Sequence, residues 1–519
     1  MKKQGFDEIQ QAYLRNEKWI GLAIGVFFSM LASVLVYIIT ATNIGISTDS
    51  VFYLTTAKRA MTEGFLAGVD STGHFPPLYP WVLALAGGIS GDLEVGARWI
   101  NIFCAGITVF FLHRICWAEV KSKNRLFAQV IISFVLLSLI LADDYLRLSA
   151  YVLSEPLFIA LLIISIFFLQ RGYVKPSLFN LCVGGFFLGG ATLTRHTGLF
   201  FLATSVIWVI FTRLGKLPRW RMAVAYLFSS WSLIFLCKIV IRPTGSRALA
   251  FHWPGEEHWH DFGVTFASWF FPYRIALPSV GWVLAALIGT LCLARLFIWG
   301  RALIRGDSDH YLIINYLAAA VVAYLLLLFV TVVFIYYITP FDYRLLFPVH
   351  VLVLILLTVS VLRIGFANRT VQYLLLSGLF VWLSTQALKG FKTVRHYSVQ
   401  GVGMGAKANL QSSAIQFLQS LPDDVFFVSN KPEVIIELLK KPCESIPPKF
   451  NSFTMAPEPS YSENMKALGS KFLTDKAVLV WFLETDRAFQ PKVSEVLEVL
   501  PIERHETSDS KIMILLFKN

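Results

Sequence analysis

Long apolar runs separated by short charged segments dominate the first 390 residues of the chain. The first run is Trp19–Ala41. Ten more runs follow, at 98–117, 126–142, 151–170, 177–194, 198–212, 222–241, 280–299, 311–338, 345–362 and 371–388. A helix that crosses the hydrocarbon core of a bilayer needs about 20 mostly apolar residues. The pattern therefore predicts an all-α polytopic membrane protein with about 11 transmembrane helices. The first run is too long for a signal-peptide core, so we interpret it as a retained span.

The pattern changes after residue 390, where long apolar runs are replaced by short alternating elements. Strand-like pieces and helical stretches follow one another at 412–420, 425–429, 432–440, 477–483, 491–499 and 511–517. Such alternation is typical of a small α/β domain. We therefore expect two domains, a transmembrane module at 1–389 and an α/β domain at 390–519.

Composition supports the membrane interpretation, because 56% of the residues are hydrophobic and only 15% are charged. A soluble protein is about 45–50% apolar and about 25% charged, so a soluble enzyme is nearly excluded. The net charge of +12 follows from the positive-inside rule, which places basic loops in the cytoplasm. The basic loops at 119–125, 171–175, 212–221, 301–305 and 363–369 fall on the side of the Lys-rich N-terminus. We expect an integral protein of a bacterial inner membrane, in contact with lipids and not with nucleic acid. With an odd number of spans, the C-terminal domain is extracytoplasmic.

The sequence contains no Walker, Rossmann or CxxC motif, so nothing indicates chemistry driven by ATP or NAD. Chemistry is expected instead in two long outer segments, 43–97 and 242–279. In the first, Asp49 begins a predicted helix and shares one face with Tyr53. The simpler alternative is that Asp49 is only the N-cap of this helix.

A second group of charges lies at 142–158, between two predicted spans. Asp143 and Asp144 lie near Arg147, and Glu155 follows just inside the next span. Ionisable groups at membrane depth mark functional sites by default, because burying them without a partner is costly. Two simpler interpretations stay open: Asp144 and Arg147 form a local ion pair, and Glu155 caps a helix.

Arg195 and Arg344 also lie on the predicted outer side, against the positive-inside trend. A fixed anionic ligand such as a phosphate would explain these two cations.

In the second long segment, residues 251–263 contain several metal-capable side chains, including Glu256 and His258. Their spacing matches no metalloprotease pattern, so we favour a solvated acceptor-side loop, although a divalent metal stays possible.

Six pieces occur in an order that resembles the GT-C superfamily of integral-membrane glycosyltransferases, which use polyprenyl-phosphate sugars. They are TDSVFYLTTAKRAMTEG, HFPPLYPWVLAL, GARWINIF, LSAYVLSEPLF, GATLTRHTGLF and DYRLLFP. The resemblance is strongest to the branch of the dolichyl-phosphate-mannose protein mannosyltransferases and the lipid A aminoarabinose transferase. It covers residues 19–360 and leaves the C-terminal domain unmatched.

The resemblance implies transfer of a sugar from a polyprenyl-phosphate donor to a lipid, glycan or protein acceptor, with inversion. Asp49 corresponds to the general base. Arg195, Arg344 and Arg59 are candidates to bind the donor phosphate. The aminoarabinose-transferase branch has a Lys where this chain has Phe75, and His74 is the candidate replacement for its phosphate contact. The candidates for orienting the acceptor are Tyr53, Asp143, Asp144, Glu155, Glu256 and His258.

Two other classes of protein compete with the enzyme. A polytopic transporter or lipid-sugar flippase should carry ionisable groups near the bilayer midplane, often within an internal repeat. Here the charges gather at the predicted outer ends of the spans, and no repeat is visible. A scaffold protein would leave Asp49 and the outer arginines without a role, so we favour the glycosyltransferase.

Overall fold

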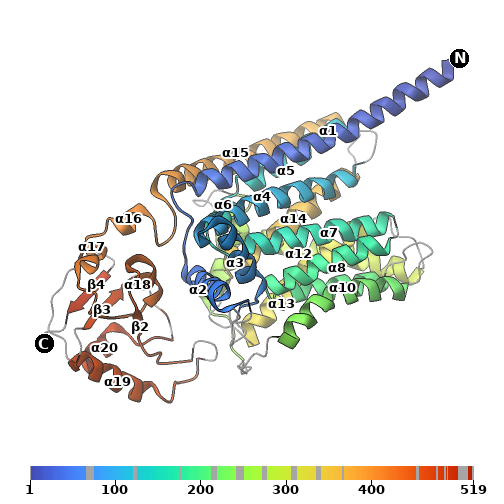
Figure 1. Cartoon of the computed structure of the whole chain (residues 1–519). Helices are drawn as coiled ribbons and strands as arrows, with labels where there is room; N and C mark the ends of the chain where they lie inside the picture. The colour runs from blue at the N-terminus through green and yellow to red at the C-terminus, as the bar shows by residue number, and fades with distance from the viewer. Residues whose placement is uncertain are drawn as a thin grey trace.

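The computed structural model describes residues 2–65, 75–120, 125–175, 177–211, 219–240, 251–271, 277–305, 312–334, 341–364, 368–451, 455–474, 477–483, 487, 489–500 and 512–516. Figure 1 shows a bundle of long helices followed by a small α/β domain at one end of the bundle. The predicted fold class, a helical membrane module with a small C-terminal α/β domain, is confirmed.

The described bundle consists of helices α1 to α15. Their bounds are α1 (Lys2–Ile39), α2 (Thr48–Glu63), α3 (Leu78–Ser90), α4 (Leu93–Ala118), α5 (Arg125–Ile140), α6 (Asp143–Ala150), α7 (Glu155–Val174), α8 (Leu178–Thr194), α9 (Gly198–Phe211), α10 (Arg219–Val240), α11 (Glu256–Ser268), α12 (Pro278–Arg305), α13 (Leu312–Phe334), α14 (Tyr343–Ile364) and α15 (Arg369–Gln400). Each predicted apolar run lies on one of these helices, although α1 begins well before its run and α15 ends well after its run.

Seven helices in the described part of the chain are long and apolar enough to cross a membrane, or eight if α5 and α6 form one bent span. The axes of these two helices differ by 52° at the break before Asp143. Helices α8 and α9 are apolar but shorter. The protein is therefore an integral membrane protein, while the expectation of about 11 spans stays a prediction.

The C-terminal domain contains a four-stranded sheet with the strand order β2-β1-β3-β4. Strands β1 (Phe426–Ser429), β2 (Cys443–Ser445) and β3 (Ala477–Phe482) are parallel, and β4 (Ile512–Leu516) is antiparallel to β3. The apolar clusters place α17 (Ser413–Ser420) and α18 (Pro432–Leu439) on one face of the sheet. Helices α19 (Tyr461–Thr474) and α20 (Val493–Val499) cover the other face. Burial of both faces explains why β3 reads as the continuous apolar run AVLVWF.

The connection between the helical bundle and the α/β domain begins after Gln400. Helix α15 continues to Gln400 and stops at Gly401, whose φ of 78° is in the left-handed region. Glycine adopts this conformation at little cost, and it ends helices for that reason. A short linker and α16 (Lys407–Leu410) then lead into the α/β domain.

Within the bundle, glycines allow α8 and α10 to approach closely. A Cβ atom at Gly189 would lie 2.6 Å from the carbonyl oxygen of Ser230, and one at Gly185 would lie 2.5 Å from that of Tyr226. Small residues of this kind are typical of helix contacts in membranes, where backbone proximity replaces the hydrophobic effect.

We expect the substitution Gly189→Ala to lower the midpoint of thermal unfolding of the purified protein. The added methyl group must push α10 away, and such overpacking costs about 1–3 kcal/mol. Gly289→Ala in α12 is the matched control, because its Cβ would meet nothing within 4 Å in the described structure. Alanine favours a helix over glycine by about 0.5–1 kcal/mol, so the control should not unfold earlier. Equal midpoints for the two variants would contradict the close contact.

Candidate functional site

Helix α2 begins with a capping box that leaves the carboxylate of Asp49 available for other contacts. Ser50 N donates to Ser47 Oγ at 3.3 Å, and Ser47 N donates to Ser50 Oγ at 2.9 Å. Ser47 is thus the N-cap, and the interpretation of Asp49 as the N-cap is wrong. Asp49 lies in the first turn, where the helix dipole favours a negative charge.

Arg344, at the start of α14, connects Asp49 to Glu155. Its Nη2 donates to Asp49 Oδ2 at 2.6 Å, and its Nε donates to Glu155 Oε1 at 2.9 Å. The backbone N–H groups of Arg344 and Leu345 donate to Asp342 Oδ1 at 3.0 Å and 3.3 Å. Asp342 therefore fixes the turn that carries Arg344, and burial raises the pKa of its carboxyl group.

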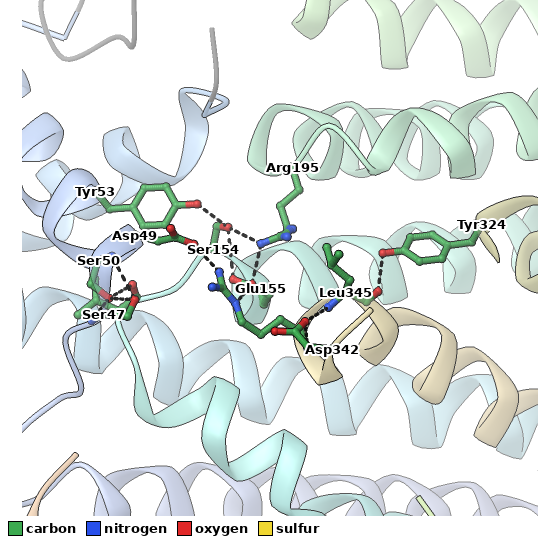
Figure 2. Close-up of polar contacts among 12 residues, drawn as sticks. Ser47, Asp49, Ser50, Tyr53, Ser154, Glu155, Arg195, Tyr324, Asp342 and Leu345 are labelled. Atoms are coloured by element: carbon green, nitrogen blue, oxygen red, sulfur yellow. Dashed lines mark hydrogen bonds and ion pairs between the residues drawn. The ribbon is translucent and has the colours of Figure 1, made fainter. Parts of the chain in front are cut away.

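Glu155 binds a second arginine from another helix. Arg195, which caps the C-terminus of α8, places Nη1 2.7 Å from Glu155 Oε1 and donates to Ser154 Oγ at 3.2 Å. Tyr53 OH lies 3.0 Å from the same Ser154 Oγ, so the network returns to α2. Figure 2 shows these side chains converging from the start of α2, the start of α7, the end of α8 and the start of α14.

The members of this network differ in how far their side chains are exposed to solvent. The Glu155 side chain is 2% exposed, whereas Arg344 and Asp49 are 25% and 29% exposed. A carboxylate buried between two guanidinium groups anchors both of them. Asp49 and Arg344 instead present a base and a cation at an accessible surface, where a ligand hydroxyl and a ligand phosphate would find partners.

Tyr53 is buried on the side of α2 that packs against α3. Its ring lies 5.0 Å from that of Phe75 and 4.8 Å from that of Tyr79, both with edge-to-face geometry. Burial raises the pKa of Tyr53 well above its usual value, so the phenol stays protonated. Tyr53 therefore joins the network through its contact with Ser154.

Asp143 and Asp144 lie in a polar cluster of their own on α6. Asp143 contacts Arg147 at 2.7 Å and accepts from Thr393 Oγ1 at 2.5 Å. Asp144 lines a small cavity together with His350, Gln386 and Lys389. The close ion pair of Arg147 is therefore with Asp143, and the prediction of a close pair with Asp144 is corrected.

Two of the remaining candidates, Arg59 and Glu256, lie at exposed positions. Arg59 is 56% exposed and lies 3.7 Å from Glu63. Glu256 is exposed in the first turn of α11. The ring of His258 faces that of Phe341, the neighbour of Asp342, at 5.9 Å. His74 lies outside the described residues, so its role stays a prediction.

Three residues that the sequence did not reveal support the network: Ser154, Asp342 and Tyr324. Tyr324 OH donates to the carbonyl oxygen of Leu345 at 2.7 Å and so holds the first turn of α14. Asp342 was detectable as a capping acid just before a predicted span. Ser154 and Tyr324 carry no sequence signal, because an isolated hydroxyl is common in spans. In the described part of the chain, no three His, Cys, Asp or Glu side chains gather to hold a metal ion.

The chain resembles known proteins in part of its sequence and in its fold. Residues 74–241 match the sequence model of the dolichyl-phosphate-mannose-protein mannosyltransferase family. No curated protein matches the sequence significantly. The arabinofuranosyltransferase AftD from Mycobacteria superposes with a TM-score of 0.50, at 13% identity over 97% of this chain and 40% of AftD. ArnT from Cupriavidus metallidurans, bound to undecaprenyl phosphate, gives a TM-score of 0.49 at 13% identity over 96% of this chain and 98% of ArnT. AglB from Archaeoglobus fulgidus, with an inhibitory peptide and a dolichol-phosphate, gives a TM-score of 0.48 at 11% identity over 90% of this chain and 70% of AglB.

The chain has a GT-C-like fold. The family match at residues 74–241 agrees with the resemblance of the sequence to the protein mannosyltransferases, and the similarity to AftD shows a shared fold. The matched residues include Glu155 and Arg195, but they do not include Asp49 or Arg344. The structure brings all four together (Figure 2).

We expect Glu155→Gln to destabilise the protein strongly. The neutral amide leaves two arginines without their shared counter-ion, and breaking a buried ion pair costs about 3–5 kcal/mol. The measurement is the thermal unfolding midpoint of the purified protein. Glu63→Gln, which removes only the exposed pair with Arg59, is the control and should change stability by at most about 1 kcal/mol. Similar midpoints for both variants would show that Glu155 is not an anchor.

Proposed function

We propose that this protein is an inverting glycosyltransferase that moves a sugar from a polyprenyl-phosphate donor to an acceptor. The observation that carries the proposal is the position of Arg344, whose guanidinium binds the accessible carboxylate of Asp49 and the buried carboxylate of Glu155. A base and two cations therefore lie within one connected network. Glycosyl transfer from a lipid phosphate needs both, because a proton leaves the acceptor and negative charge develops on the phosphate.

In the proposed reaction, Asp49 takes the proton from the acceptor hydroxyl or amine. The acceptor atom then attacks the anomeric carbon from the face opposite the phosphate. The bond between that carbon and the phosphate oxygen breaks, and its electron pair leaves with the polyprenyl phosphate. Attack from the opposite face inverts the configuration, and a positioned carboxylate base is suited to this step.

The charge on the leaving phosphate is neutralised by Arg344 and Arg195. Guanidinium groups bind phosphate oxygens in pairs, and donors fixed in advance stabilise charge as it develops. Glu155 holds both groups in place, since it contacts Arg195 at 2.7 Å and Arg344 at 2.9 Å. Arg344 is partly exposed, so it can exchange its contact with Asp49 for one with the donor phosphate.

The donor class is supported by the family match at residues 74–241, since the name of that family includes a dolichyl-phosphate sugar. We place the site on the extracytoplasmic side, because the basic loops mark the opposite side as cytoplasmic. The acceptor is a lipid, glycan or protein. A transporter is less consistent with the network, which joins the ends of helices and not their middles (Figure 2).

The substitution Asp49→Asn tests the general base. Asparagine keeps the shape but cannot take up the proton, so we expect kcat to fall about 10²- to 10⁴-fold. The assay follows transfer from a polyprenyl-phosphate sugar extract to membrane acceptors, with products identified by mass spectrometry. Glu63→Gln, at the exposed end of the same helix, should keep full activity. Full activity of Asp49→Asn would refute the role as base, and uptake of lipid-sugar into vesicles without product would favour a transporter.

The substitution Arg344→Gln tests the phosphate contact. Loss of the guanidinium should raise the KM for the donor, because a charge-assisted hydrogen bond contributes about 1.5–3 kcal/mol, or roughly 10- to 100-fold. The measurement is initial rate against donor concentration at saturating acceptor. Arg395→Gln, an exposed arginine of α15, is the matched control. An unchanged donor KM in the Arg344 variant would remove Arg344 from the phosphate site.

A further inference from the structure

The C-terminal domain touches the first turn of α2, directly beside the candidate base. Thr48 Oγ1 donates to Glu433 Oε1 at 3.0 Å, and Thr48 is the neighbour of Asp49. Glu433 lies in the first turn of α18 and is 9% exposed. Its Oε1 also accepts from Arg487 Nη2 at 2.5 Å. The contact is therefore a charge-assisted junction between the two domains, in which Glu433 is nearly buried and Thr48 is exposed.

The carboxylate of Glu433 also suits the electrostatics of this junction. It lies in the first turn of α18 and contacts the first helical residue of α2. Helix N-termini carry a partial positive charge from unpaired N–H groups, so a carboxylate there is favoured. Removal of this charge would loosen the start of α2, and Asp49 is the second residue of that helix.

The linker from α15 holds the chain that leads into α2. Val402 N donates to Asn43 Oδ1 at 2.8 Å, and Met404 N donates to the carbonyl oxygen of Ile46 at 3.0 Å. Gly403 has a φ of 66°, and a Cβ atom there would lie 2.6 Å from that same carbonyl oxygen. Only glycine permits this approach without strain, so the linker is fitted closely to the segment before α2.

The same segment pairs on its other side with the chain that leads to Glu155. Gly45 N donates to the carbonyl oxygen of Ala150 at 2.8 Å, and Val152 N donates to that of Gly45 at 2.9 Å. Ser50 Oγ donates to the carbonyl oxygen of Val152 at 2.8 Å. The segment before α2 thus lies between the linker and residues 150–152, so the linker from the C-terminal domain contacts the same short segment that leads to Asp49.

We propose that Glu433 is a positioning residue through which the C-terminal domain sets the orientation of Asp49. The inference rests on the proposed function, in which Asp49 is the base. Through Thr48, the domain holds the first turn of α2 against Arg344. A shift of the domain therefore moves the base, whereas Arg344 and Arg195 stay anchored by Glu155. The domain controls proton removal from the acceptor and leaves donor binding unchanged.

The first test is amide hydrogen exchange of the full-length protein in detergent. Glu433→Gln should raise the exchange rate of α2 peptides about 10-fold, because a charge-assisted contact is lost. Thr48→Val should have the same effect, whereas Thr48→Ser keeps the hydroxyl and should match the wild type. Glu444→Gln removes an exposed pair with Lys471 in the same domain and is the control. Unchanged exchange of α2 in Glu433→Gln would overturn the proposal.

The second test is a double-mutant cycle in the transfer assay. Glu433→Gln should lower kcat about 10- to 100-fold through misplacement of the base, with the donor KM within about twofold of the wild type. Adding Thr48→Val should have little further effect on kcat, because both substitutions break the same contact between Thr48 and Glu433. Independent, additive losses or a raised donor KM would contradict the coupling. If the wild type transfers no sugar, the proposed function fails, and hydrogen exchange alone decides the role of Glu433.

Discussion

The site depends on one buried carboxylate, that of Glu155, which is shared by Arg195 and Arg344. It is 2% exposed, and both guanidinium groups lie within 3 Å of its Oε1. Burying an unpaired charge in the bundle would be prohibitive, so the three side chains are stable only together. This constraint fixes α7, α8 and α14 relative to one another at the end of the bundle near the C-terminal domain (Figure 1).

Around this fixed centre, α2 is held by three further contacts. Asp49 reaches Arg344 at 29% exposure, Tyr53 supports Ser154, and Thr48 contacts the C-terminal domain. In the proposed reaction, the two arginines that Glu155 anchors bind the donor phosphate, and the more exposed carboxylate of Asp49 takes the proton from the acceptor.

Much of this arrangement was predictable from the chain, and the errors have physical reasons. Asp49, Glu155, Arg195 and Arg344 stood out because charges are rare in this sequence, and the two arginines also run against the topology trend of the predicted outer side. Asp143 and Asp144 stood out for the same reason, yet they lie in a separate cluster with Arg147 and Lys389. A rare charge in an apolar sequence indicates that the charged group needs a partner. It does not identify that partner, because the partner depends on the fold.

The sequence by itself determined the helical spans, the small α/β domain and the rare charges, because hydrophobic periodicity and charge content are local properties. Tertiary structure alone decided the pairing, since Arg344 meets a carboxylate 295 residues away and Thr48 meets one 385 residues away. It also placed Ser154 and Glu433 in contact with the residues of the site, which no pattern indicated. Such contacts arise when packed helices bring distant turns together, and the cost of leaving a buried charge unpaired then selects the partners.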